Sequence, residues 1–222
     1  DKSPEVNIDI LDSEFSTEIE NKVKSIFWVR DMVNFPALTK SPDFFQHKVE
    51  ELIEGLDINL KSYDQEWIKE NNMGGVIGVS QGSDRPPKFL VGEYNTKAKK
   101  QIALIGKGVL FDSGGLSLKS PAGMETMKTD MAGAATAWGI IALVAKEGLD
   151  IGLKVYTPIV ENMPSGSAIR PGDILSMRNG KSIEVMNTDA EGRLIMADAL
   201  AYASESKPDI ICDVATLTGA AY

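Results

Sequence analysis

The chain has 222 residues, 43% of them hydrophobic and 25% charged, which is typical of a globular protein with a sizeable core. The formal net charge is −9, and no basic stripe is present, so we expect no nucleic-acid partner. The one cysteine, Cys212, excludes a disulfide framework and is expected to be a buried small hydrophobe. No run of 18 apolar residues predicts a membrane span, and the polar start does not resemble a signal peptide.

The first half of the chain predicts two helices and several strands after a polar lead-in or linker at residues 1–25. Residues 41–56 have helical spacing, residues 57–63 alternate like a strand, and residues 64–72 predict a second helix. Three apolar runs bounded by glycine predict buried strands: GGVIGVS, KFLVGEY and IALIGKGVLF.

In the second half, residues 124–148 predict one long helix rich in alanine and glycine. A strand DIGLKVYTPIV, a loop ENMPSGSAIRPGD and a hairpin around Asn179-Gly180 follow. The chain then predicts a helix, RLIMADALAYASES, and a final strand, PDIICDVATL. Alternating helices and continuously apolar strands favour an α/β fold, with a mostly parallel central sheet covered by helices on both faces.

Several kinds of catalysis are disfavoured by what the chain lacks. The only histidine, His47, lies on the helix predicted at residues 41–56, where a surface position is expected, so a Ser-His-Asp or Cys-His mechanism is disfavoured. Zinc sites built on several histidines or cysteines are excluded within one chain. The segment GKGVLFDSGG contains glycines and a lysine, but its spacing matches neither common phosphate-binding loop.

Carboxylates at the ends of strands and the starts of helices remain as candidate chemistry. Asp112 follows an apolar strand, Asp130 is placed at a helix start, and Asp189 and Glu191 lie between a strand and a helix. If the backbone is extended, Asp189 and Glu191 point the same way and converge. Each acid taken alone is better explained as a helix cap or a surface charge, so the case rests on their combination. Together they would repel one another unless divalent ions neutralised them, and two ions about 3.5–4 Å apart with a bridging water are a recurrent hydrolytic design.

The same segments resemble a known family. IGKGVLFDSGGLSLK, GMETMKTDMAGAA, ENMPSG with the following RPGD, and NTDAEGRLIMADAL are similar to the leucyl aminopeptidase (cytosol aminopeptidase) family, and the last block is its signature. The resemblance runs from residue 26 to the end, although RDMVNFPALTKSPD matches more loosely. It implies that residues 1–25 are a linker or the remnant of an N-terminal region. Residues 26–222 would be a metallo-aminopeptidase catalytic domain without its C-terminal part.

The resemblance also assigns roles to single residues. Five positions match the family's metal ligands: Lys107, Asp112, Asp130, Asp189 and Glu191. Lys107 would bind as a neutral amine, and Glu191 would bridge both ions. Lys119 matches the lysine that polarises the scissile carbonyl and holds the developing oxyanion. Arg193 matches the arginine that holds a bicarbonate ion serving as general base.

Four further positions match the pocket for the first side chain of the substrate: Met127, Thr216, Leu217 and Gly219. For Met127 an ordinary core position is an equal alternative, because Met124, Met127 and Met131 form a helical stripe.

The resemblance therefore implies a cytoplasmic two-metal hydrolase that releases N-terminal residues from peptides with a free N-terminus, apolar and leucine-like ones preferred. Zinc or manganese would be the ions, with magnesium as a third candidate, and the family's assembly is a homo-hexamer. A second hypothesis is a catalytically incomplete piece that folds, binds metal and serves only in assembly. DNA binding, which some family members combine with peptidase activity, is disfavoured by the charge.

Overall fold

The computed structural model describes residues 13–219 and builds them around one six-stranded sheet. The strands are β1 (Ile58–Tyr63), β2 (Lys88–Tyr94), β3 (Gln101–Gly106), β4 (Gly108–Asp112), β5 (Gly152–Asn162) and β8 (Ile210–Val214). The main order is β1-β2-β5-β3-β8, and β4 pairs with the later part of β5. The pairs β3–β5, β4–β5 and β3–β8 are parallel, whereas β1–β2 and β2–β5 are antiparallel. The mostly parallel sheet predicted from the sequence is confirmed.

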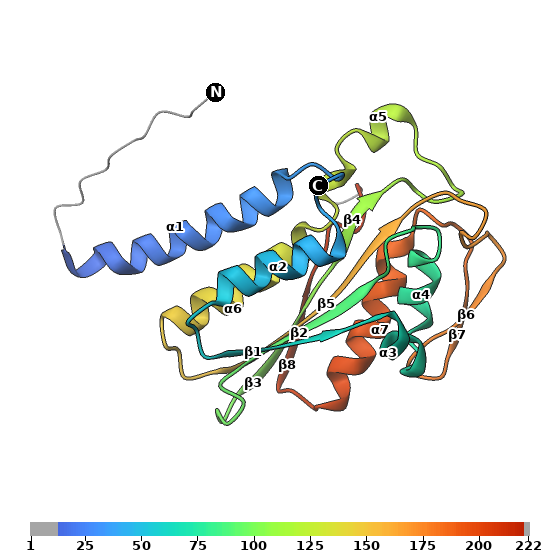
Figure 1. Ribbon diagram of the computed structural model, residues 1–222. Helices are drawn as coiled ribbons and strands as arrows, with labels where there is room; N and C mark the ends of the chain where they lie inside the picture. Colours follow the sequence, from blue (N-terminus) through green and yellow to red (C-terminus); the bar gives the residue numbers. More distant parts are fainter. Residues whose placement is uncertain (1–12, 220–222) are drawn as a thin grey trace.

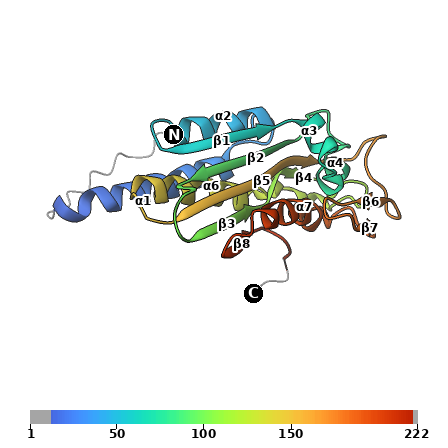
Figure 2. The ribbon, with the colours of Figure 1, turned by 90° about the horizontal axis from the view of Figure 1, so that it is seen from below.

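Helices cover both faces of this sheet, as predicted (Figures 1 and 2). One face packs against α1 (Ser13–Asn34), α2 (Pro42–Ile53) and α6 (Ala132–Lys146). The other face packs against α3 (Gln65–Glu70), α4 (Gly74–Ser80) and α7 (Glu191–Glu205). The side chains of β3 alternate between the two cores: Leu104 enters the first, and Ala103 and Ile105 enter the second.

The helices and the hairpin predicted from strong local signals are present. Ser41 caps α2 by accepting a hydrogen bond from the Phe44 amide, and Asp64 caps α3 in the same way. The predicted hairpin consists of β6 (Ile174–Ser176) and β7 (Ser182–Glu184), with Gly180 at φ +79° in the turn. His47 is exposed on α2, as expected.

The run GGVIGVS, predicted as a strand, is the helix α4 instead. Its glycines allow contacts that any larger residue would prevent: a Cβ on Gly74 would lie 2.0 Å from the Ser176 carbonyl oxygen, and one on Gly75 would lie 2.4 Å from that of Leu194. The buried carboxylate of Asp198, on α7, accepts hydrogen bonds from the Gly75 and Val76 amides and so caps the helix. A short apolar run of this kind is compatible with either a strand or a helix, and here the tertiary contacts select the helix.

The segment expected to be a linker or an N-terminal remnant, residues 1–25, is helical in its second half. Residues 1–12 lie outside the described part of the chain, but residues 13–25 form most of the first helix, α1. This helix packs along α6, where a Cβ on Gly139 would be 2.7 Å from Val29 Cγ2. The sequence did not predict this helix because the polar early part of α1 carries a weak periodic signal, and its packing on α6 stabilises it.

The helix predicted over residues 124–148 is divided. A short helix α5 (Pro121–Met124) and a 3₁₀ turn η1 (Met127–Thr129) precede α6, which begins only at Ala132. The break leaves Asp130 between η1 and α6, beside the end of β4. This irregular stretch supplies one of the candidate ligands.

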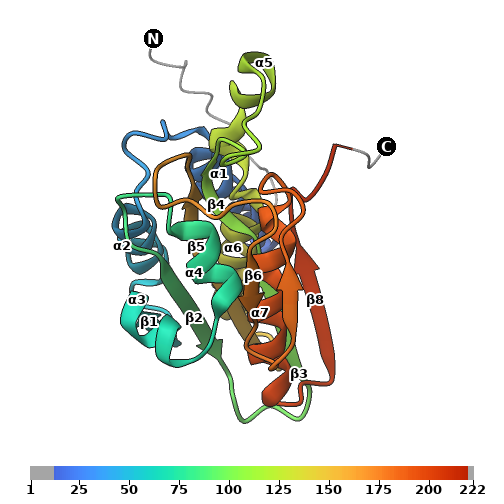
Figure 3. The ribbon, with the colours of Figure 1, turned by 90° about the vertical axis from the view of Figure 1, so that its right-hand side faces the viewer.

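The strand β8 lies at one edge of the sheet and pairs only with β3 among the described residues (Figure 3). Cys212 is exposed on it, so the prediction of a buried cysteine was wrong: the described part of the chain places no element over this position. Within residues 13–219, no helix is both long and apolar enough to cross a membrane.

Candidate metal centre

The predicted ligands meet where the parallel strands end. Lys107 follows β3, Asp112 is the last residue of β4, Asn162 is the last residue of β5, and Thr216 lies just beyond β8. Because these four strands run in the same direction, their carboxyl ends share one edge of the sheet, the usual location of ligand sites in open α/β folds. Asp189 and Glu191 reach this edge from the turn before α7.

Lys107 is the centre of the first group of contacts. Its Nζ lies 2.8 Å from Asp130 Oδ1 and 2.8 Å from Glu191 Oε1, and it donates a 2.9 Å hydrogen bond to the Thr216 carbonyl. All three charged side chains are almost fully buried. Burial opposes the charge on Lys107, yet Glu191 and Asp130 raise the pKa of its amine above the ordinary value. Burial also raises the pKa of Asp130, to about 7, and that of Glu191.

Lys119 is the centre of the second group. Its Nζ lies 3.0 Å from Asp112 Oδ2 and 2.6 Å from Asp189 Oδ1, and 18% of its side chain is exposed. Burial works against the charge here too, but the two carboxylates raise the pKa of Lys119, so the group remains an ammonium. Lys119 therefore faces solvent on one side and the acids on the other.

The two groups form one cluster. Asp112, Asp189 and Glu191 each offer a carboxylate oxygen, and these oxygens lie within 4.8 Å of one another. The cluster thus contains four carboxyl groups and two ammonium groups, a formal excess of two negative charges when all four acids are ionised, in a largely buried place. In addition, Asp130 Oδ2 is buried and has no hydrogen-bond partner among residues 13–219. A site rich in carboxylate oxygens, one of them buried and unpaired, fits divalent cations, which prefer oxygen ligands.

Asp189 and Glu191 converge for a different reason from the one predicted. The backbone there is not extended: Asp189 lies in a turn, Ala190 precedes the helix, and Glu191 is the first residue of α7. The next residue, Gly192, lets Lys107 approach, because a Cβ at that position would be 2.5 Å from Lys107 Cε. The prediction of convergence is confirmed, but a turn into a helix produces it.

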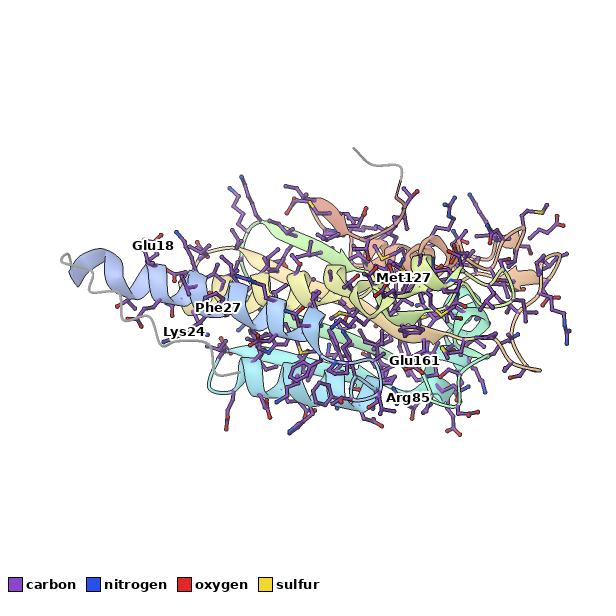
Figure 4. The ribbon with its side chains drawn as sticks, turned by 90° about the horizontal axis from the view of Figure 1, so that it is seen from above. Glu18, Lys24, Phe27, Arg85, Met127 and Glu161 are labelled. Carbon is purple, nitrogen blue, oxygen red and sulfur yellow. The ribbon has the colours of Figure 1, made fainter. Side chains whose placement is uncertain are left out.

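Of the four residues predicted for the substrate pocket, Thr216 contacts this cluster. Thr216 Oγ1 donates a 2.9 Å hydrogen bond to Asp130 Oδ1, so this residue also holds a candidate ligand. Leu217 and Gly219 are exposed after β8, and Met127 is half-buried on η1 (Figure 4), whereas Met131 is fully buried in the core. The methionine stripe is therefore split, and only Met131 belongs to the core.

Arg193 is exposed on the first turn of α7, two residues after Glu191. Among the described residues 13–219, its side chain has no partner in an ion pair or hydrogen bond.

Asn162 contacts the cluster and Thr188 contacts Asn162, although the sequence did not single out either residue. Both are buried, and Asn162 Nδ2 donates to Asp112 Oδ1 at 2.8 Å and to the Thr188 carbonyl at 3.0 Å. Both residues belong to segments that carry the family resemblance, ENMPSG and NTDAEGR. They were not predicted as site residues because the amide of Asn162 and the hydroxyl of Thr188 do not by themselves indicate a metal ligand.

A separate cavity of about 500 Å³ contains none of the predicted site residues. It is lined in part by Leu38, Phe111 and Met163, and by the Arg85–Glu161 ion pair, whose nitrogen and oxygen are 2.9 Å apart (Figure 4). Arg85 also donates to the carbonyls of Ala37 and Leu38, so the ion pair joins the segment after α1 to β5. These satisfied contacts indicate a structural role.

The fold and this cluster define an α/β protein with a candidate metal centre at the carboxyl ends of parallel strands. Residues 27–222 match the family model described as "Cytosol aminopeptidase family, catalytic domain". The chain belongs to this family.

Individual relatives agree with that membership. The chain is 48% identical over 194 residues to a "Probable cytosol aminopeptidase" of Leifsonia xyli, covering 87% of this chain and 39% of that protein. It is 46% identical over 212 residues to "Peptidase B" of Yersinia pestis, covering 92% of this chain and 49% of that protein. The chain thus spans less than half the length of these relatives.

Two solved structures have the same fold. The cytosol aminopeptidase of Coxiella burnetii superimposes with a TM-score of 0.90 at 36% identity, over 94% of this chain and 45% of that one. The bottromycin maturation enzyme BotP, solved in complex with Mn, superimposes with a TM-score of 0.89 at 35% identity, over 96% of this chain and 47% of that one.

Proposed function

We propose that this chain forms the metal-holding part of an aminopeptidase that uses two divalent ions to hydrolyse the first peptide bond of a substrate. The observation that carries the proposal is the cluster of four carboxylates and two lysines at the carboxyl ends of the parallel strands. Membership of the cytosol aminopeptidase family supports it.

Five side chains would hold the two ions, and they are those matched to the family's ligands: Lys107, Asp112, Asp130, Asp189 and Glu191. When bound, two such ions lower the pKa of a water to near neutrality and polarise a substrate carbonyl. Zinc and manganese are the proposed ions, with magnesium as a third candidate. Manganese is the practical probe, since the solved BotP complex contains it.

Lys107 has to change its protonation to act as a ligand. Between Glu191 and Asp130 its amine holds its proton, because both acids raise its pKa. Cations bound to the same acids would reverse this effect and favour the neutral amine, which has a free electron pair. Gly192 keeps the space in which this amine lies.

Lys119 and Arg193 would act on the substrate side. Lys119 remains an ammonium at the partly exposed edge of the cluster, so it can donate a hydrogen bond to the scissile carbonyl oxygen as negative charge develops there. The exposed guanidinium of Arg193 would hold a bicarbonate ion as the proton acceptor.

The substrate would be a peptide with a free N-terminus and an apolar first residue. The exposed apolar side chain of Leu217 and the half-buried Met127 are suited to contact such a residue, beside Thr216 and Gly219. By the same family resemblance we propose a cytoplasmic protein without nucleic-acid or membrane partners. The family's assembly is a homo-hexamer, and sedimentation velocity tests whether this chain assembles.

The test is titration of the metal-free chain with Mn²⁺ in a calorimeter, followed by hydrolysis of leucine amide. We expect two ions per chain, and Asp189→Ala should remove at least one ion and abolish hydrolysis. Hydrolysis that survives Asp189→Ala would refute the two-metal assignment. Two bound ions without hydrolysis would favour the alternative, a metal-binding piece with a role in assembly.

A further inference from the structure

Asn162 connects the two loops that carry the candidate ligands. It is buried at the end of β5, between the loop after Asp112 and the turn that holds Asp189. Its Nδ2 donates both hydrogens, one to Asp112 Oδ1 at 2.8 Å and one to the Thr188 carbonyl at 3.0 Å. Its backbone carbonyl accepts hydrogen bonds from the backbone amide and the hydroxyl of Ser113, at 3.0 and 2.7 Å. One residue thus binds both loops through side chain and backbone.

Thr188 completes the connection from the other side. Its hydroxyl donates to the Gly114 carbonyl at 2.6 Å and accepts from the Ser117 amide at 2.8 Å. Its amide donates to the Ser117 hydroxyl at 3.2 Å. The turn before Asp189 is therefore attached at three points to the loop that leads from Asp112 to Lys119.

The space between the loops is closed by Gly115. A Cβ on this residue would lie 2.9 Å from Asn162 Oδ1 and 3.1 Å from Thr188 Oγ1, and its φ of +65° is one that glycine adopts without strain. The backbone of one loop, at Gly115, therefore packs directly against the side chains of Asn162 and Thr188.

The amide of Asn162 also sets the direction of Asp112. Asp112 Oδ1 accepts from Asn162 Nδ2 and from the Gly114 amide, which leaves Oδ2 directed at Lys119 and the cluster. An amide does this without adding charge to a site that already has an excess of carboxylates. Residues behind metal ligands commonly orient them in this way.

We propose that Asn162, together with Thr188, is a positioning residue that fixes the two ligand loops relative to each other, so that divalent ions meet Asp112 and Asp189 already oriented. This inference rests on the proposed function, because it concerns the same ions.

The experiment compares Mn²⁺ affinity and amide hydrogen exchange in the unsubstituted chain and in Asn162→Ala. We expect Mn²⁺ binding to weaken 10- to 100-fold, the range that follows loss of a residue behind a metal ligand. In the metal-free chain the amides of Gly114 and Ser117 should exchange at least about tenfold faster, since their hydrogen bonds depend on the connection.

A second pair of variants, at Thr188, tests the same proposal if Asn162→Ala folds poorly. Thr188→Val removes the hydroxyl at nearly constant volume and should weaken Mn²⁺ binding likewise, whereas Thr188→Ser keeps the hydroxyl and should retain the parent affinity. The matched control is Thr157→Val, on the same strand, which removes a buried hydroxyl that accepts from Trp138 Nε1 far from the cluster. It should lower stability and leave both readouts at the site unchanged.

The outcomes separate the two claims. Unchanged Mn²⁺ affinity in Asn162→Ala and Thr188→Val, or an equal loss in Thr157→Val, would overturn the positioning role. If the unsubstituted chain takes up no Mn²⁺, the proposed function is refuted. In that case, faster exchange confined to Asn162→Ala and Thr188→Val supports the connection between the loops, and unchanged exchange overturns it.

Discussion

Gly192→Ala tests whether the position of the Lys107 amine determines metal binding. A Cβ at position 192 would lie 2.5 Å from Lys107 Cε and 2.8 Å from its Nζ. Non-bonded carbon atoms prefer about 3.5–4.0 Å, so the end of Lys107 must retreat by about 1 Å. That distance takes Nζ out of hydrogen-bond range of at least one of Asp130 and Glu191, which now lie 2.8 Å away.

The same substitution favours the helix that contains it. Alanine in place of glycine within a helix stabilises it by about 0.5–1 kcal/mol, which offsets part of the cost of moving Lys107. We therefore expect the free energy of unfolding to fall by about 1–2 kcal/mol, because the lost hydrogen bond between buried charged groups outweighs the gain in the helix. Mn²⁺ affinity should fall about tenfold or more, and leucine amide hydrolysis about 100-fold, because a displacement of 1 Å has such effects in active sites.

Urea unfolding gives the stability, and calorimetric titration with Mn²⁺ gives the affinity. The matched control is Gly139→Ala, also within a helix, whose Cβ would be 2.7 Å from Val29 Cγ2 at the contact between α1 and α6. It should lower stability and leave Mn²⁺ affinity unchanged. Parent-like Mn²⁺ binding in Gly192→Ala would show that the position of Lys107 does not matter and would refute the reasoning.

Three further predictions follow from buried or paired charges. Asp198→Asn should destabilise the chain by about 2–3 kcal/mol in urea unfolding, because an amide cannot accept from all three backbone N–H groups that the carboxylate now satisfies; a loss below about 0.5 kcal/mol would contradict this. Lys40 is fully buried against three carbonyls, and burial lowers its pKa from 10.5 to about 8. Between pH 8 and pH 10.5 the unfolded chain therefore binds more protons than the folded chain, so the free energy of unfolding rises with pH in this range. The free energy of unfolding should gain about 2 kcal/mol from pH 8 to 10 relative to Lys40→Met, and equal slopes for the two chains would exclude this titration. Lys119→Met should lower the rate of leucine amide hydrolysis about 100- to 1,000-fold while Mn²⁺ still binds, and loss of Mn²⁺ binding would instead make Lys119 part of the metal site.

The candidate site was predictable to an unusual degree, because its chemistry is concentrated in short segments. The acids of NTDAEGR and the lysine and aspartate of GKGVLFD lie next to apolar strands, and those strands end at one edge of the sheet. What the pattern could not indicate is how the acids converge. Asp189 and Glu191 meet through a turn and a helix start, and Asp130 reaches the cluster from a break between η1 and α6. Such breaks depend on contacts with distant residues.

The sequence by itself determined the α/β class, the capped helices α2 and α3, the hairpin turn at Gly180 and the identity of the charged residues at the site. These features are local, since capping side chains, glycine turns and apolar periodicity act within a few residues. Only the tertiary structure decided that GGVIGVS is a helix, because the Asp198 cap and the close approach of α7 come from more than 110 residues away. It alone placed Asn162 and Thr188 between the ligand loops and exposed Cys212 at the sheet edge. Hydrogen bonds and packing between segments far apart in the chain leave no periodic trace in either segment, so they become visible only when the chain is folded.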